Sequence, residues 1–256
     1  MASNLASLVR NLQQRKGRKR QGLTVAEGVR LVEEALDAGV SFRGALVGKS
    51  LGETGRGSAL LRDLVSHAVQ LEQVPDRILR NLAETETPQG VVAIIDPPRF
   101  DLSAVRPAPG SAVLVLDGVQ DPGNVGALLR TALAMGAPGA ILLSGTADLR
   151  NPKVIRAAMG ASFRLPAAHT TVNGLEKWLA DHEAQLWIAD VGGTSIKRLA
   201  APDRLAVVVG NEGAGVRQTV RDLAIRRIAI PLARGAESLN VTVAAGIILY
   251  EVQRGR

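Results

Sequence analysis

Residues 113–135 read VLVLDGVQDPGNVGALLRTALAM and pass from an apolar run through a polar turn into a helical pattern. The run at 113–116 is continuously apolar, which is typical of a strand buried on both faces. The turn contains glycine and proline, and the residues after it are apolar at helical spacing. The stretch therefore predicts a strand, a loop and a helix in the order that builds α/β proteins.

The same order repeats towards the C-terminus. Further apolar strand candidates lie at residues 140–143, 186–189, 205–209 and 228–230. Helical patterns cover residues 125–135, 153–158, 172–180, 217–223 and 239–252. This alternation predicts an α/β domain with a mostly parallel sheet covered by helices on both faces. Ligands bind such sheets beyond the carboxyl ends of the strands, so we expect the chemistry in the loops that follow them.

The first part of the chain mixes shorter units. Helical patterns lie at residues 28–37 and 58–69, and strand candidates lie at 45–47 and 90–95. The stretch that follows is rich in proline and shows no periodicity, which is typical of a linker. Because 256 residues exceed a typical single domain, we expect two. The predicted layout is a smaller N-terminal α/β domain over 1–96, a linker over 97–111 and the larger α/β domain over 112–256.

Positive charge is concentrated near the N-terminus. The net charge is +7, and residues 10–20 contain six basic residues and no acid. Such a cluster indicates contact with phosphate, although a solvated, partly disordered tail has the same composition. Aromatic residues make up only 2% of the chain, which disfavours a platform that stacks single-stranded bases. We expect any bound RNA to be held by its backbone and shape, through Arg15, Lys16, Arg18, Lys19 and Arg20.

The composition excludes several classes of site. The chain has no cysteine, so disulfides, thiolate nucleophiles and cysteine metal sites are ruled out. The three histidines lie far apart in the sequence, which argues against a zinc site, and we expect no metal. The sequence has no apolar run of the roughly 20 residues that span a bilayer and no signal-peptide pattern. We therefore expect a cytoplasmic protein.

Three loops that follow predicted strands contain glycine and polar side chains. They cover residues 117–126, 210–215 and 231–240. Glycine at a strand end lets the backbone approach a ligand and exposes amide donors. The chain has no G-x-x-x-x-G-K-[ST] loop, and the GNEGAG loop lacks the later acidic residue that a dinucleotide fold requires. Three such loops at one sheet indicate a single site of another kind.

Five side chains in or after these loops are candidates for chemistry. Arg130 interrupts an otherwise apolar helix, so its guanidinium must reach a carboxylate, a cleft or a phosphate. Asn124 opens that helix, where capping is the structural alternative. Glu212 is a lone acid in a glycine-rich turn, and its alternative role is an ion pair with an arginine such as Arg130. Ser238 and Asn240 precede the last helix, where capping is again the alternative.

The three loops resemble, in order and spacing, the three motifs of the SpoU/TrmH family of RNA ribose methyltransferases, which belongs to the SPOUT superfamily. The matching stretches are DGVQDPGNVGALLRTALAMGA, VVVGNEGAGV and IAIPLARGAESLNVTVAAGI. The stretch RKGRKRQGLTVAEGVRLVEEAL also looks like the family's ribosomal-protein-like substrate-binding domain. That second match is less specific, because basic residues often precede a helix.

The resemblance implies an S-adenosylmethionine-dependent enzyme and a deep trefoil knot formed by the last loops and the C-terminal helix. General folding rules alone predict an ordinary open sheet, since knots are rare. The cofactor would sit bent in the knot, held largely by backbone groups at Gly210, Ile230 and Leu239, with Gly192 of the VGGT loop as a further contact. The family is typically homodimeric. The last helix is apolar nearly all round, which agrees with burial at an interface.

The resemblance also assigns roles in catalysis. Arg130 matches the family's catalytic arginine, and Asn124, Glu212, Ser238 and Asn240 support it. A guanidinium is effectively always charged, so its role in removing the ribose proton has two versions. Arg130 either acts while transiently neutral, or it orients the hydroxyl and the neighbouring phosphate while a phosphate oxygen takes the proton.

Other functions remain open at this stage. The first is a non-catalytic RNA-binding or ribosome-assembly protein that keeps the fold, and the second is a methyltransferase of the same superfamily that acts on a base nitrogen. The motifs NVGALLR and SLN favour ribose, and a dinucleotide-dependent oxidoreductase lacks its fingerprint. The basic N-terminus and two-domain layout favour ribosomal RNA over transfer RNA.

Overall fold

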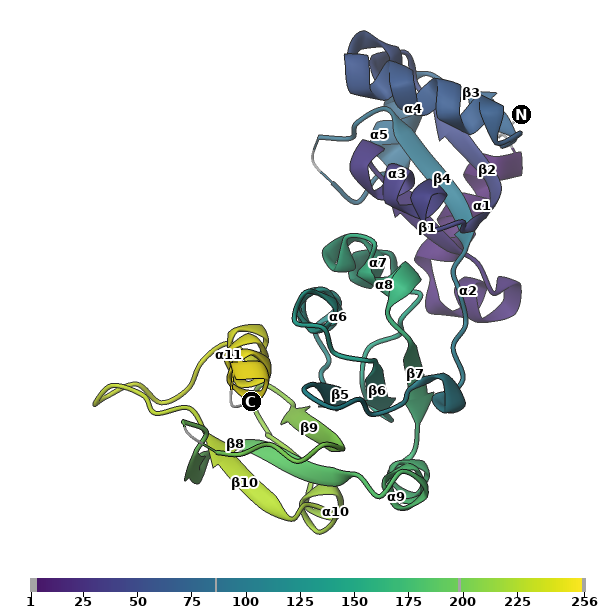
Figure 1. The fold of residues 1–256 in the computed structure, drawn as a ribbon. Coiled ribbons are helices and arrows are strands. Elements are labelled where there is room, and N and C mark those ends of the chain that lie inside the picture. The colour runs from purple at the N-terminus through teal and green to yellow at the C-terminus, as the bar shows by residue number, and fades with distance from the viewer. Residues whose placement is uncertain (1–3, 86, 198, 255–256) are drawn as a thin grey trace. The chain divides into compact units, whose positions relative to one another are not determined.

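The computed structural model describes residues 4–85, 87–197 and 199–254. The chain forms two compact units (Figure 1). The first contains Met1–Pro98 together with Asp148–Phe163, and the second contains Arg99–Ala147 together with Arg164–Arg256. No helix within the described ranges is long and apolar enough to cross a membrane.

The first unit is built on a four-stranded sheet in the order β1-β4-β2-β3. The central pair and the β1 edge are antiparallel, whereas β2 and β3 are parallel. Its strands are β1 (Thr24–Glu27), β2 (Ser41–Val47), β3 (Leu71–Gln73) and β4 (Val91–Asp96). Its helices include α1 (Asn4–Gln13), α2 (Arg15–Gln21), α3 (Val29–Asp37), α4 (Gly55–Ser66), α5 (Asp76–Leu82) and α7 (Pro152–Ala158).

Strand β4 explains how helices come to cover both faces of this sheet. Successive side chains of a strand point to opposite faces. Val91, Ala93 and Ile95 therefore join one core, which includes buried residues of α3 and α4. Val92 and Ile94 join the other, which includes buried residues of α1 and α5. The continuous apolar pattern of this strand, predicted at 90–95, follows from this burial on both sides.

The basic segment near the N-terminus is folded, so the interpretation as a disordered tail is wrong. Leu5, Val9 and Leu12 lie on one face of α1 and are buried. Helix α2 ends at Gly22, whose φ of 74° lies in the left-handed region and whose N–H donates to the carbonyl of Arg18. Glycine adopts this conformation at little cost, which fixes the end of the basic helix.

The segment 148–163 lies between two strands of the second unit in sequence but packs within the first unit. Ile155 and Phe163 are buried in the core that contains β4. The Thr24 hydroxyl donates to the carbonyl of Arg150 at 2.6 Å. Arg156 lies 3.8 Å from Glu27 and 3.5 Å from Glu84. The predicted layout of two consecutive domains did not foresee this insertion.

The second unit is a six-stranded, wholly parallel sheet in the order β10-β8-β9-β5-β6-β7. Helices α6 and α11 lie on one side of the sheet and α9 and α10 on the other (Figure 1). The prediction of a mostly parallel α/β domain is confirmed. The strands are β5 (Ala112–Asp117), β6 (Ala140–Leu143), β7 (Ala167–Thr170), β8 (Gln185–Ser195), β9 (Leu205–Gly210) and β10 (Arg226–Ala229). The helices named here are α6 (Pro122–Ala134), α9 (Val172–Asp181), α10 (Gln218–Arg221) and α11 (Val241–Arg254).

Candidate active site

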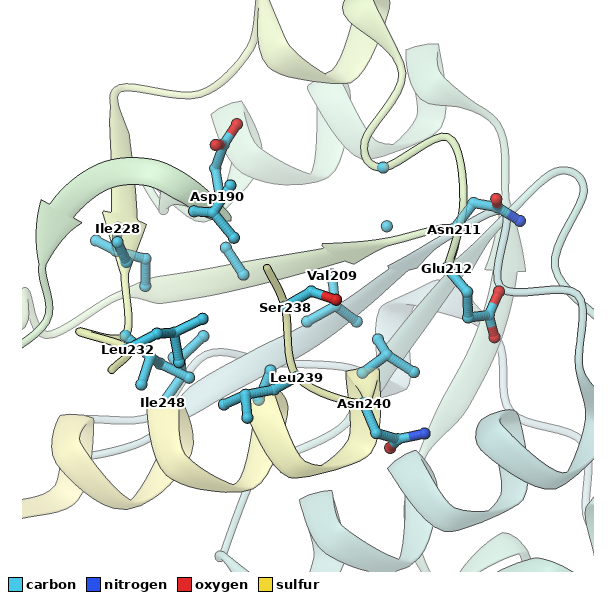
Figure 2. Close-up of a pocket in the computed structure, with 18 residues that line it drawn as sticks. Asp190, Val209, Asn211, Glu212, Ile228, Leu232, Ser238, Leu239, Asn240 and Ile248 are labelled. Atoms are coloured by element: carbon cyan, nitrogen blue, oxygen red, sulfur yellow. The ribbon is translucent and has the colours of Figure 1, made fainter. Parts of the chain in front are cut away.

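Residues 189–191 within β8, the loops after β9 and β10 and the start of α11 line a cavity of about 420 Å³ (Figure 2). Because all strands of this sheet are parallel, their carboxyl ends meet at one edge, and loops far apart in sequence converge there. Binding sites for small molecules usually measure about 300–1,000 Å³, so the cavity suits such a ligand. This cavity lies where the site was expected, beyond the carboxyl ends of the strands.

Three of the four predicted cofactor contacts line this cavity, namely Gly210, Ile230 and Leu239. The fourth, Gly192, lines a second cavity instead. Its neighbours Asp190 and Val191 line the first cavity in its place. The expectation for Gly192 is therefore not supported by its position.

The cavity combines apolar walls with polar groups from its loops. Val209, Ile228, Leu232 and Ile248 supply apolar surface, as Figure 2 shows. A Cβ atom at Gly210 would lie 2.3 Å from the carbonyl carbon of Gly215, so only glycine lets the two ends of the loop approach this closely. The setting suits a ligand with both an apolar ring and hydroxyl or charged groups.

A chain of hydrogen bonds joins the three predicted loops beside the cavity. The Asn124 Nδ2 donates to Glu212 Oε1 at 2.7 Å, and Asn240 Nδ2 donates to Asn124 Oδ1 at 3.4 Å. Glu212, Ser238 and Asn240 line the cavity themselves. The fold thus brings together four of the five predicted catalytic residues, which lie up to 116 positions apart in the sequence.

The capping alternatives for the two asparagines are resolved differently. Asp121, not Asn124, caps α6, because its carboxylate accepts the backbone N–H of Asn124 at 2.8 Å. The Asn124 side chain is left for Glu212 and Asn240. Asn240 both caps α11 and contacts Asn124, since its Oδ1 accepts the N–H of Thr242 at the start of α11 while its Nδ2 donates to Asn124.

Arg130 lies on α6 six residues after Asn124, and its side chain is exposed. Among the described residues it makes no ion pair or side-chain hydrogen bond, and the Glu212 carboxylate accepts from Asn124 rather than from Arg130. The ion pair of Glu212 with Arg130 is therefore absent. Exposure removes the cost of burying a guanidinium and leaves its donors for an anion that approaches this side of the site.

Two further residues, missed by the sequence analysis, shape the loop that carries Glu212. Asn211 Nδ2 donates to the carbonyl of Gly118 at 3.0 Å. The buried carboxylate of Asp117 accepts the backbone N–H and the Nε of Arg217, at 2.8 and 2.7 Å. Asp117 could have been found from the sequence, because it is an acidic residue at the end of an otherwise apolar strand.

Asp190 is the third missed residue. One carboxylate oxygen accepts the N–H of Gly192 at 2.9 Å, and the other pairs with Arg221 Nη1 at 2.5 Å. Arg227 lies 3.5 Å away. The hydrogen bond from Gly192 and then that from Arg221 hold the pKa of this carboxyl below its usual range, against a smaller effect of burial. The wall of the cavity therefore carries an ionised acceptor.

The basic residues predicted to contact RNA divide into two groups. Arg15, Lys16, Lys19 and Arg20 are exposed on α2. Arg18 is buried, with its guanidinium donating to the carbonyls of Leu12 and Gln13 and to Asp148 at 3.1 Å. The prediction of RNA contact is wrong for Arg18, because the protein occupies its donors.

Comparison with known proteins agrees with this geometry. The profile of the SpoU rRNA Methylase family matches residues 111–250, and that of the MRM3-like substrate binding domain matches residues 7–93. A Synechocystis sp. protein named "Uncharacterized tRNA/rRNA methyltransferase slr1673" is 34% identical over 98% of this chain and 90% of its own length.

Two further relatives have more specific names. The 23S rRNA (guanosine(2553)-2'-O)-methyltransferase RlmP of Bacillus subtilis is 31% identical over 95% of this chain and 94% of its own. The crystal structure of an AdoMet-bound rRNA methyltransferase from Sinorhizobium meliloti covers 98% of this chain and 95% of its own, with 29% identity and a TM-score of 0.86. The resemblance drawn from the three loops is confirmed, and the chain belongs to the SpoU rRNA methylase family.

Proposed function

We propose that this protein transfers a methyl group from S-adenosylmethionine to the 2'-hydroxyl of a ribose in ribosomal RNA of the 23S type. The observation that carries the proposal is the hydrogen-bonded chain Glu212–Asn124–Asn240 beside a cavity of suitable size, with the exposed Arg130 on the same helix as Asn124. The names of RlmP and of the Sinorhizobium meliloti structure support the choice of substrate.

The cavity residues fit the cofactor. Gly210 and Ile230 would offer backbone groups, Leu239 would cover the apolar ring, and the ionised Asp190 would accept hydrogen bonds from ribose hydroxyls. Bound S-adenosylmethionine supplies a methyl group on a positively charged sulfur. The acceptor hydroxyl then needs alignment and the loss of a proton, and no metal or covalent intermediate is involved.

The side chains around the cavity align the RNA. Fixing an acceptor in line with a reactive group is worth about 7–11 kcal/mol of a barrier. Arg130, with its planar fork of donors, is suited to hold a phosphate next to the target ribose. Because a guanidinium is effectively always charged, we assign Arg130 to orienting the hydroxyl and phosphate and a phosphate oxygen to taking the proton. Asn124, Asn240 and Ser238 would hydrogen-bond the nucleotide.

The first unit would select the RNA. Its exposed Arg15, Lys16, Lys19 and Arg20 lie on one short helix and suit the phosphate backbone of a structured RNA. The match of residues 7–93 to a substrate-binding domain supports this role. Ribosomal RNA as substrate also implies a location in the cytoplasm.

Two structural features belong to the same proposal. We infer from membership of the family that the last loops and the C-terminal helix form a deep trefoil knot. The loops at 210–215 and 230–240 and the start of α11 all contribute to the first cavity. We also infer a homodimer that covers the exposed apolar side chains of α11, with the site completed at the interface. An experimental structure with cofactor bound would test both.

The decisive experiment follows methyl groups from labelled S-adenosylmethionine into transcripts of ribosomal and transfer RNA, with nucleoside mass spectrometry of the product. Wild type should yield a 2'-O-methylated nucleoside in ribosomal RNA. Arg130→Ala should lose at least 100-fold in transfer, roughly the contribution of an oriented charged group, and keep its cofactor affinity. Arg106→Ala, an exposed arginine of the same unit, is the matched control. Methylation of a base nitrogen, or cofactor binding with no transfer to any RNA, would contradict the proposal.

A further inference from the structure

A second cavity, of about 590 Å³, lies against the outer edge of the sheet in the second unit. Strand β10 is the edge strand and pairs only with β8 (Figure 1). The register between them jumps, with Arg227 opposite Ile188 and the next residue, Ile228, opposite Thr194. Residues 189–193 therefore form a bulge in β8. Asp190 and Val191 of this bulge line the first cavity, whereas Gly192 and Gly193 line the second.

Three arginines line the second cavity, Arg221 from α10 and Arg226 and Arg227 from β10. A single carboxylate, that of Asp190, serves two of them, Arg221 at 2.5 Å and Arg227 at 3.5 Å. The remaining one, Arg226, lies over the ring of Trp187 at 5.2 Å and has no carboxylate partner in the described part of the chain. The cavity thus carries a surplus of two positive charges.

Most guanidinium donors in this cavity have no acceptor among the residues that the structure describes. Each guanidinium offers five N–H donors. Arg221 uses two donors, on the carbonyl of Val216 and on Asp190, and Arg227 uses one. The nearby Asp222 accepts from Gln218 and does not line the cavity. An anion with several oxygens would accept hydrogen bonds from these remaining guanidinium N–H groups.

The backbone of the bulge leaves room for the arginine heads. A Cβ atom at Gly192 would lie 2.9 Å from Arg227 Nη2, and one at Gly193 would lie 2.6 Å from the N of Ile228. Gly192 therefore lets the guanidinium of Arg227 lie against the bulge, and Gly193 lets the backbones of β8 and β10 approach each other closely. The side chain is still 55% exposed, so a macromolecular ligand can reach it.

We propose that this cavity binds a phosphate group, and specifically a backbone phosphate of the RNA substrate, through Arg226 and Arg227. The choice of RNA rests on the proposed function. Arginine matches the geometry of phosphate by paired N–H donors, and contacts of this kind hold nucleic acid in register without reading its sequence. Charges on an edge strand also prevent sheets from pairing edge to edge, which is the competing explanation.

The test uses the full chain with Arg226→Gln and with Arg226→Gln/Arg227→Gln. The matched control is Arg204→Gln, an exposed arginine of the same unit that pairs with Glu183 and does not line the cavity. The dissociation constant for a ribosomal RNA fragment is measured from 50 to 300 mM KCl, and calorimetry with inorganic phosphate provides a second arm. Circular dichroism confirms that each variant is folded.

We expect Arg226→Gln to weaken RNA binding about 3- to 10-fold, and the double variant, which removes both arginines from one phosphate, to lower the salt slope of the affinity by about 1. A salt slope of the double variant equal to that of Arg204→Gln would overturn the proposed phosphate site. Methylation of ribosomal RNA by the wild type would still uphold the proposed function. Tight binding of inorganic phosphate with unchanged RNA affinity in the variants would overturn the assignment to RNA and indicate a free phosphate compound.

Discussion

At the scale of single residues, the buried carboxylate of Asp117 fixes the loop that presents Glu212. Both of its oxygens accept from Arg217, and Arg217 directly follows that loop. Asp117→Ala removes hydrogen bonds to a charged group and should lower the free energy of unfolding by about 1.5–3 kcal/mol, as measured by urea denaturation. Asp181→Ala, an exposed acid of the same unit, should change it by less than about 0.5 kcal/mol. Equal stability of the two variants would refute this role.

Asp190 gives a prediction for pH dependence. Its pKa is lowered in the folded state by the Gly192 N–H and by Arg221, so its ionised form stabilises the fold above the unfolded pKa of about 3.9. That stability is lost as the pH falls through the lower, folded pKa. Asp190→Asn should therefore be less stable than wild type at pH 7, and the difference should shrink below about pH 4. Denaturation by urea at pH 7, 5 and 3 measures this, and a constant difference at all three would contradict it.

At the scale of elements, continuous apolar runs predicted the buried strands well and failed where a strand is short or half-exposed. The strand at 140–143 and the helix after 171 were placed within a residue or two, because burial on one or both faces sets their pattern. Strand β7, AAHT, was missed, since it has only four residues and two of them are partly or fully exposed. Helix α1 was also missed, although its buried residues Leu5, Val9 and Leu12 recur at helical spacing.

In helix α2, the exposed basic residues are expected to bind RNA, whereas the buried Arg18 stabilises the fold. The variant with Arg15, Lys16, Lys19 and Arg20 all changed to Gln should bind ribosomal RNA at least 10-fold more weakly at 150 mM salt and keep its stability. Arg18→Gln should instead lower the free energy of unfolding by about 3 kcal/mol, because it leaves Asp148 without its buried partner. Fluorescence anisotropy and urea denaturation measure the two effects. If Arg18→Gln weakened RNA binding without lowering the free energy of unfolding, the structural role assigned to the buried Arg18 would be wrong.

At the scale of the whole molecule, the converging loops were predictable and the insertion was not. Parallel strands bring their carboxyl ends to one edge, so the loops carrying Asn124, Glu212 and Asn240 were expected together. No comparable rule predicts that Ile155 packs within the core of the first unit. Arg18 and Asp148 are 130 positions apart, and no periodicity in the sequence links residues at that distance.

The exposed side of α11 gives the prediction for assembly. Val243 and Tyr250 are 51% and 53% exposed, and they lie seven residues apart, which places them on one face of the helix. Leu133 of α6 is 38% exposed, and α6 packs beside α11. Large apolar side chains gathered on packed helices mark an interaction surface.

Because α11 also supplies Val241, Ala244 and Ile248 to the first cavity, a partner on this helix would border the active site. Under the proposed homodimer, Val243→Asp should yield a monomer in light scattering and lower methyl transfer at least 10-fold, since burying an unpaired carboxylate at an interface is costly. Val65→Asp, at a valine of α4 that is 62% exposed, should leave the proposed dimer and the activity unchanged. A monomeric wild type with full activity would show that the site is complete within one chain.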